Sequence, residues 1–258
     1  RQRQMCIRDR LWYPTDVAAD SAGNVYVADA HNNAIKKIAA NGGAVTQLLS
    51  ASFPASVAVD KLGNVYFSSV SSDTRITSVN EFVASSGTVT TLLSAGLKTV
   101  SGLAVDDAGN VYVADSDAKV VKEIAGDANH TVTVLASGFN IPSGVALDIV
   151  GNVYVSDLGS NTIKKISVAP GHAVTTIATG LGGPNGLAID AAGNIYIADT
   201  YSYSIKKTTI DGGVVTTLKS NLDMPAAVAV DGAGNVYYAE YILTEVDALI
   251  YGVQSVPM

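Results

Sequence analysis

Short segments in which apolar and polar residues alternate recur along the whole chain, separated by glycine-containing turns. Residues 144–147 read Gly-Val-Ala-Leu, residues 152–156 read Asn-Val-Tyr-Val-Ser, and an Asp-x-x-Gly-Asn turn joins them. Because side chains alternate across a strand, Tyr154 and Ser156 share one face, while Val153 and Val155 share the other. The pattern predicts a two-stranded hairpin with both faces buried.

Two further apolar segments follow most of these hairpins, and they predict a third and a fourth antiparallel strand. The third strands are expected at 35–38, 121–124, 163–166, 205–208 and, in the last copy, 246–249. The fourth strands are expected at 45–48, 89–92, 132–135, 174–177 and 215–218. No segment shows helical periodicity, so the fold class is predicted to be all-β.

The unit is repeated six times around a Gly-Asn-(Val/Ile)-Tyr core. Its asparagines are Asn24, Asn64, Asn110, Asn152, Asn194 and Asn235, which are 40, 46, 42, 42 and 41 residues apart. Ala stands six residues before each asparagine, Asp four before and Tyr two after. This period is typical of a four-stranded propeller blade and is too long for ankyrin or leucine-rich repeats. We expect the large Tyr to pack between blades and the small Ala to lie near the axis.

The segment 142–157, Pro-Ser-Gly-Val-Ala-Leu-Asp-Ile-Val-Gly-Asn-Val-Tyr-Val-Ser-Asp, resembles the NHL repeat. The chain from Leu11 onwards resembles a six-bladed NHL-type (TolB-like) β-propeller of four-stranded antiparallel blades. The resemblance implies a family of varied functions, which includes sensor domains of bacterial receptor Ser/Thr kinases, RNA-binding domains of animal regulators and lyase relatives of the same shape. The repeat motif itself is structural.

Composition narrows these functions. The net charge is −7, whereas nucleic-acid binding needs a basic surface, so we expect no nucleic-acid partner. The Lys pairs of the third strands are expected to be solvated. No apolar run approaches the roughly 18 residues that span a bilayer, so we expect no membrane insertion of this domain.

The two ends of the chain differ from the repeats. Residues 1–10 contain four arginines and the single cysteine, Cys6, and resemble a translated adapter sequence, so we expect a foreign segment followed by one propeller domain at 11–258. Residues 4–7 nevertheless have the spacing of an outer strand, and 250–258 lack the fourth-strand pattern. Closure of the ring is therefore the weakest part of the fold prediction. We expect the native protein to be extracellular or periplasmic.

Residues that recur in every repeat are interpreted as structural. The acids that end the second strands are expected to bond their own following loops, and those four residues before each asparagine to form hairpin turns. His31 lies after a second strand, whereas His130 and His172 lie in turns at the opposite rim, so the three cannot converge. We predict no catalytic residues, no metal site and no cofactor.

The variable positions are the candidates for binding. The loops after the second strands and the crossovers between blades share one rim of the disc, and this rim, together with the channel mouth, varies between copies. The candidate binding residues are Asp16, His31, Asn32, Phe53, Asp73, Asp117, Phe139, Asn140, Asn161, Asn185, Tyr201, Tyr203, Asp223 and Tyr241. Tyr201, Tyr203 and Tyr241 are expected to form one aromatic sector beside Asn185 and Asp223.

The sequence favours a non-catalytic binding or sensor module whose variable rim holds a protein loop or a glycan. The alternative is a propeller lyase or hydrolase with its site at the channel mouth. Asp16 would then be the prime candidate, because its equivalents are Ser56, Gly102, Gly144, Gly186 and Ala227. A third possibility is a spacer or assembly domain.

Overall fold

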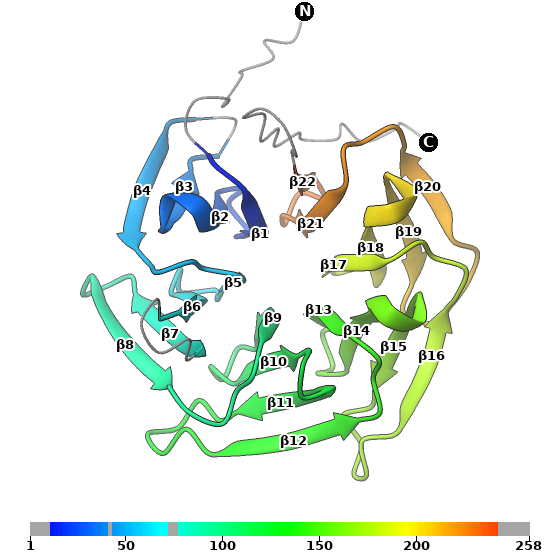
Figure 1. Cartoon of the computed structure of the whole chain (residues 1–258), viewed down its shortest axis with the longest axis horizontal. Coiled ribbons are helices and arrows are strands. Elements are labelled where there is room, and N and C mark those ends of the chain that lie inside the picture. Colours follow the sequence, from blue (N-terminus) through cyan, green and yellow to red (C-terminus); the bar gives the residue numbers. More distant parts are fainter. Residues whose placement is uncertain (1–10, 41–42, 72–76, 242–258) are drawn as a thin grey trace, which may run out of the picture.

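The computed structural model describes residues 11–40, 43–71 and 77–241, and these form a ring of antiparallel sheets. Figure 1 looks along the ring axis, with the first strand of each sheet nearest the centre and the fourth on the outside. Five sheets have four strands in sequence order and one has two. We number these sheets blades 1 to 6.

The strand bounds are as follows. Blade 1 contains β1 (Pro14–Ala19), β2 (Val25–Asp29), β3 (Ala34–Ile38) and β4 (Val45–Ser50). Blade 2 contains β5 (Val57–Val59), β6 (Val65–Val70), β7 (Thr77–Val83) and β8 (Thr88–Leu93). Blade 3 contains β9 (Val100–Val105), β10 (Val111–Asp115), β11 (Val120–Ile124) and β12 (Val132–Ser137).

Blade 4 contains β13 (Pro142–Leu147), β14 (Val153–Asp157), β15 (Thr162–Ile166) and β16 (Val174–Ala178). Blade 5 contains β17 (Pro184–Ile189), β18 (Asn194–Asp199), β19 (Ser204–Thr209) and β20 (Thr216–Lys219). Blade 6 contains β21 (Pro225–Val230) and β22 (Val236–Glu240). Short 3-10 turns follow β2, β14 and β18, namely η1 (Ala30–Asn32), η2 (Leu158–Ser160) and η3 (Thr200–Ser202).

The predicted all-β propeller of four-stranded antiparallel blades is confirmed, but six complete blades are not. The last repeat contributes only β21 and β22 to the described structure. The third strand expected at 246–249, the segment 250–258 and the outer strand considered at 4–7 lie outside the described residues, as does Cys6. Strand β7 was not predicted, because its Thr-Ser-Val-Asn start lacks the Ile/Val-Lys-Lys pattern of its counterparts.

Neighbouring blades interlock through a large tyrosine wedge, as predicted, and the predicted valine pair faces it in blade 4, whereas Phe67 in blade 2 and Tyr238 in blade 6 replace one of the valines. Tyr112 and Ala114 of β10 share one buried cluster with Val153 and Val155 of β14. Tyr154 faces the other way and packs in the next cluster, with β18 of blade 5. Each sheet therefore uses one face against the preceding blade and the other against the following blade.

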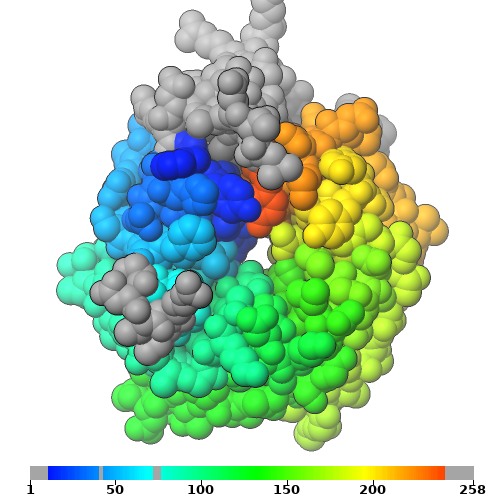
Figure 2. All heavy atoms as spheres, in the orientation of Figure 1, coloured from blue at the N-terminus to red at the C-terminus, as the bar shows by residue number. Residues whose placement is uncertain are grey.

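The same packing closes the ring within the described part of the chain. Val17 and Val27 of blade 1 share a buried cluster with Ala227 and Ala229 of blade 6. The six alanines of the first strands line the central channel, as expected. Larger side chains there would narrow it, because six strands converge on the axis (Figure 2).

A polar hub under each hairpin fixes the position of the wedge. The Oδ1 atom of Asp148 accepts the Asn152 amide N–H, and its Oδ2 atom accepts the Asn152 side-chain amide and the Tyr154 hydroxyl at 2.7 and 3.1 Å. The Asn152 side chain accepts the Val168 N–H from the next turn. The expected turn role of these aspartates is confirmed, and the hub also explains the repeated Asn and Tyr.

We predict that Tyr154→Ala lowers the free energy of unfolding by roughly 3–5 kcal/mol, since it empties a fully buried site. Tyr201→Ala, at a ring that is 59% exposed, is expected to cost less than about 0.5 kcal/mol. Chemical denaturation of both variants measures the difference. Equal losses would contradict the separation between interblade scaffold and variable rim.

Candidate functional site

The loops after the second strands and the crossovers into the first strands lie together on one face, which we call the variable rim. Figure 1 looks onto this face, where the short helical turns are drawn. The backbone shows the proximity directly: the amide of Ala30 in η1 donates to the carbonyl of Tyr13, and Leu158 donates to Ile141. The two loop types therefore form one continuous surface in each blade.

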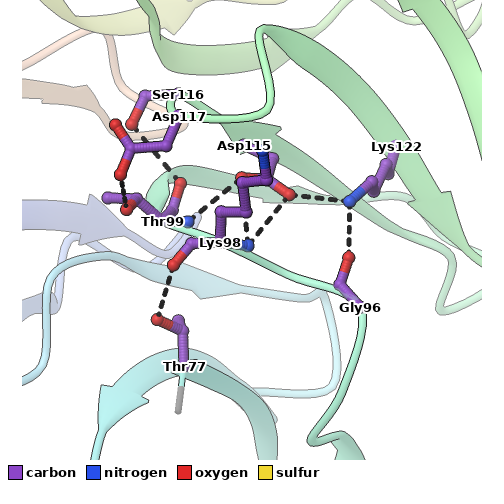
Figure 3. Close-up of polar contacts among 8 residues, drawn as sticks. All are labelled: Thr77, Gly96, Lys98, Thr99, Asp115, Ser116, Asp117 and Lys122. Carbon is purple, nitrogen blue, oxygen red and sulfur yellow. Dashed lines mark hydrogen bonds and ion pairs between the residues drawn. The ribbon is translucent and has the colours of Figure 1, made fainter. Parts of the chain in front are cut away.

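A buried carboxylate at the end of the second strand anchors the variable rim in blades 1, 3, 4 and 5. Asp115 ends β10 and accepts the N–H groups of Lys98 and Thr99 in the incoming crossover (Figure 3). The Lys122 Nζ atom of β11 lies 2.7 Å from its Oδ2 atom. Burial on its own raises the pKa of Asp115, but Lys122 and the two N–H groups outweigh it and hold the pKa below its usual value.

Two interpretations of the sequence need correction here. The acids that end the second strands bond mainly the preceding crossover rather than the following loop; only Asn32 beside Asp29 and Ser160 beside Asp157 follow the expected pattern. The lysine pairs are not free in solvent. The first lysine of each pair, Lys36, Lys164 or Lys206, forms an ion pair with this buried acid, and so does the single lysine of β11, Lys122.

The second lysine of three pairs lies over the wedge tyrosine of its own blade. Its Nζ atom is 5.0–5.5 Å from the ring centroid, as for Lys37 over Tyr26, Lys165 over Tyr154 and Lys207 over Tyr196. Both lysines are used because adjacent strand residues point to opposite faces of the sheet. The Lys pair is thus a structural element of the blade.

An aromatic cluster occupies the sector of the variable rim where blades 6, 1 and 2 meet. Tyr13 stacks on His31 with centroids 4.7 Å apart, and Trp12 meets the same imidazole edge-on at 5.0 Å. Phe53 lies 5.6 Å from His31, and Tyr241 lies 5.0 Å from Tyr13. Trp12 and Phe53 are 54% and 45% exposed, so apolar surface here faces solvent.

Two rings of the cluster are held in a strained backbone conformation. Tyr13 and Phe53 have φ angles of 57° and 41°, in the left-handed region that bulky side chains disfavour. Each directly precedes the proline that begins a blade, and Gly183 and Met224 take the same position and conformation in blades 5 and 6, with φ 72° and 49°. For a residue other than glycine such strain costs about 1–3 kcal/mol.

The expected tyrosine sector is brought together in part. Tyr241 interacts electrostatically with Tyr13 and Tyr201, and the side chain of Asn185 bonds its hydroxyl. Burial, with Tyr13, raises the pKa of Tyr241 to about 12, although the Asn185 bond opposes the shift. Tyr203 is half exposed at the end of η3 with φ 53°. Tyr241 thus links the predicted sector to the aromatic cluster.

Asp16 lies in the channel wall beneath the cluster. Its Oδ2 atom accepts the Ser56 hydroxyl and the Val57 N–H at 2.5 and 3.0 Å, and its Oδ1 atom accepts the Val17 N–H. Burial raises the pKa of Asp16 from 3.8 to about 6, and these hydrogen bonds offset only part of the shift. The channel has a volume of about 220 Å³, and Asp16 is the one charged residue among the described residues that line it.

The spacing between neighbouring first strands explains why Asp16 differs from its equivalents in blades 3 and 4. A side chain at Gly102 would meet the carbonyl oxygen of Ser143, and one at Gly144 would meet that of Asn185, because neighbouring first strands approach closely there. Between blades 1 and 2 a side-chain bridge from Asp16 to Ser56 takes the place of that backbone contact. Ser56 then accepts the Leu103 N–H of blade 3.

Other candidates have structural partners. Phe139 is buried, with Lys164 over its ring, which corrects its assignment to the exposed rim. Asn140 donates to the Gly159 carbonyl, Asn161 accepts the Gly183 N–H and Asp117 accepts the Thr99 hydroxyl. Asp223 donates its N–H to Glu240. Asp73 lies outside the described residues.

The histidines lie where the sequence placed them, with His31 on the variable rim and the other two opposite. His130 and His172 occupy turns between third and fourth strands. Among the described residues no group of three His, Cys, Asp or Glu side chains is arranged to hold a metal ion. Within the same part of the chain, no helix is long and apolar enough to cross a membrane.

Sequence reasoning missed Trp12 and Tyr13. The signal for Tyr13 was the position directly before the proline of each repeat, where Phe53 stands in the second copy. Comparing that position between copies would have shown two aromatic residues among Ile141, Gly183 and Met224.

Comparisons with known proteins support the fold. The NHL-repeat family model matches residues 11–38 and 181–207. A search of curated proteins found no match. A Bacteroides thetaiotaomicron protein of unknown function superimposes with a TM-score of 0.74 and 21% identity, covering 90% of this chain and 67% of the other.

Two solved structures of enzymes are also similar. A Xanthomonas campestris gluconolactonase superimposes with a TM-score of 0.76 at 17% identity, covering 90% of this chain and 84% of its own. Virginiamycin B lyase from Staphylococcus aureus has a TM-score of 0.68 at 14% identity, with 94% and 85% covered. At these identities the likeness concerns the fold alone.

We predict that stability falls as pH rises through the range in which Asp16 ionises. The folded pKa of Asp16 is about 6 and its ordinary value is 3.8, so the folded state holds the proton more tightly, and ionisation lowers the free energy of unfolding by about 2 kcal/mol between pH 4 and pH 7. The difference in unfolding free energy between wild type and Asp16→Asn should show this dependence in urea titrations. Asp107→Asn, at an exposed carboxylate, serves as the control. A difference that does not change with pH would contradict the burial of an ionisable Asp16.

Proposed function

We propose that this protein is a non-catalytic binding module and that its ligand is a loop of a partner protein held on the aromatic cluster. The observation that carries the proposal is the set of contacts that joins Trp12, Tyr13, His31, Phe53 and Tyr241 across three blades while leaving Trp12 and Phe53 exposed. Exposed aromatic residues on a rigid scaffold are typical anchors of protein interfaces.

The geometry favours a protein loop over a glycan. Tyr13 lies against His31 at an interplanar angle of 14°, so one face of each ring is already covered. Sugar rings stack on free aromatic faces, whereas a protein loop can pack its side chains against ring edges and the grooves between them. A glycan is therefore the alternative outcome of the binding experiment.

The scaffold supports this role because the contacts that stabilise the crossover are separate from the rings that would contact a partner. The crossover that carries Trp12 donates its amide to Asp29 at 2.7 Å, and Asp29 is paired with Lys36. The base of the cluster is thus fixed by buried polar contacts, while its rings remain outside the core. A preorganised surface loses little entropy on binding.

A second candidate is a lyase or hydrolase with its site at the channel mouth. The observation in its favour is Asp16, whose pKa of about 6 suits proton transfer near neutral pH. A panel of lactones and esters, assayed with wild type and Asp16→Asn, tests it. We expect no turnover, because the described channel wall places no histidine or second carboxylate beside Asp16. Turnover abolished by the substitution would establish the enzyme instead.

We also propose that the native protein forms a six-bladed ring and acts outside the cytoplasm as part of a larger sensor or interaction protein. The six interblade clusters support the ring, since blade 6 already packs on both neighbours. The extracellular or periplasmic location remains a proposal from the sequence resemblance.

We predict that the double variant Tyr13→Ala, His31→Ala loses at least tenfold in affinity for its protein partner. The variant removes two anchors, and a tenfold change in affinity corresponds to only about 1.4 kcal/mol of binding free energy. Binding of wild type and variant to peptide and glycan arrays identifies the ligand, and biolayer interferometry then measures the affinities. Asn140→Ala, on the rim of blade 4, is the matched control. A ligand bound equally by wild type and the double variant would place the site elsewhere.

A further inference from the structure

The channel mouth beside the aromatic cluster carries a negative charge that no cation of the described residues neutralises. Four acids of the variable rim, Asp29, Asp115, Asp157 and Asp199, each have a lysine partner. Within residues 11–40, 43–71 and 77–241, the donors to Asp16 are neutral, namely the Ser56 hydroxyl and two backbone amides. The polar residues that line the channel with it, Thr15, Ser101 and Asn185, carry no charge.

The carboxylate has capacity for another partner. A carboxylate has about four acceptor positions, and three hydrogen bonds occupy Asp16. The channel volume of about 220 Å³ is several times the roughly 30 Å³ of one liquid water molecule, so a side chain can enter. Asp16 follows the crossover directly, which puts it at the end of the channel that opens on the variable rim.

The surroundings of Asp16 include aromatic residues of blades 6 and 1. Tyr241, which follows Glu240, is the titratable group that interacts with Asp16, and Tyr13 lies against it. Aromatic faces next to carboxylates attract organic cations.

We propose that the channel mouth receives a lysine or arginine side chain of the partner loop, whose cationic group pairs with Asp16 beside Tyr13 and Tyr241. This inference rests on the proposed binding function and specifies the chemistry of the residue that enters the channel. The cation replaces the missing counter-ion of Asp16, while the rings of the aromatic cluster contact the rest of the loop. The opposite mouth, lined by Asp20, Asp106, Asp148, Asp190 and Asp231, is different because each of these acids is bonded within its own hairpin hub.

Binding of a cation is coupled to the proton on Asp16. The carboxyl is largely protonated at pH 5 and ionised at pH 7.5, since its pKa is about 6. A cation that pairs with the ionised form must therefore displace the proton, and its affinity should fall about tenfold between pH 7.5 and pH 5. By reciprocity, a saturating cation lowers the pKa of Asp16.

The test uses N-acetyl-arginine amide and its neutral isostere N-acetyl-citrulline amide as probes. NMR titrations of the whole chain at pH 7.5 and pH 5 measure their affinities, and the carboxyl carbon signal of Asp16 reports its pKa. We expect the arginine probe to bind about tenfold more tightly than the citrulline probe at pH 7.5, and Asp16→Asn to abolish this preference. Asp107→Asn removes one carboxylate from the opposite mouth and should leave the preference unchanged.

The outcomes separate the two proposals. Equal binding of both probes to wild type, no detectable binding of either, or an arginine preference that survives Asp16→Asn would overturn the cation proposal. The amide spectrum of Asp16→Asn confirms that the variant is folded, and the pKa measurement on wild type stands independently of it. Partner binding that survives Tyr13→Ala, His31→Ala would contradict the proposed role of the aromatic cluster. Loss of the arginine preference in Asp16→Asn would still support the cation site.

Discussion

Packing between neighbouring sheets is the interaction on which the rest of this structure depends. Tyrosines and small residues of one blade pack against two large apolar side chains of the next blade, as Tyr112 and Ala114 do against Val153 and Val155. A single four-stranded sheet with two apolar faces cannot bury either face alone. The ring satisfies all of them together, and the inner positions therefore vary little from repeat to repeat.

A second set of interactions fixes the loops of the variable rim to the packed sheets. The buried acids that end the second strands of blades 1, 3, 4 and 5 bind the crossover amides and a lysine of the third strand, as Asp115 does with Thr99 and Lys122. Without that lysine the buried carboxylate would be uncompensated, which costs several kcal/mol. The loops are thus anchored at their bases, so their side chains are free to differ.

The proposed binding residues lie where the repeat pattern is broken. The residue before the blade proline is aromatic in blades 1 and 2, as Tyr13 and Phe53, whereas the same left-handed conformation is taken by Gly183 in blade 5 and Met224 in blade 6. Asp16 stands where blades 3, 4 and 5 have glycine, because the first strands of those blades nearly touch their neighbours. Both departures lie on the sector formed by blades 6, 1 and 2, and together they combine an apolar surface with an unpaired charge at the mouth of the channel.

The sequence by itself determined the repeat, the four-strand order and the faces of each strand. These follow from local periodicity and turn chemistry, which the six copies repeat and so reinforce. It also located the variable rim, because strand polarity decides at which end each loop emerges. The partners of the lysines, the burial of Phe139 and the aromatic cluster could not be derived in this way. The lysine contacts form between adjacent strands of one folded blade. The aromatic cluster joins residues that are 18 positions apart, as Tyr13 and His31, to 228 positions apart, as Tyr13 and Tyr241, and the latter pair meets only because blades 6 and 1 pack together.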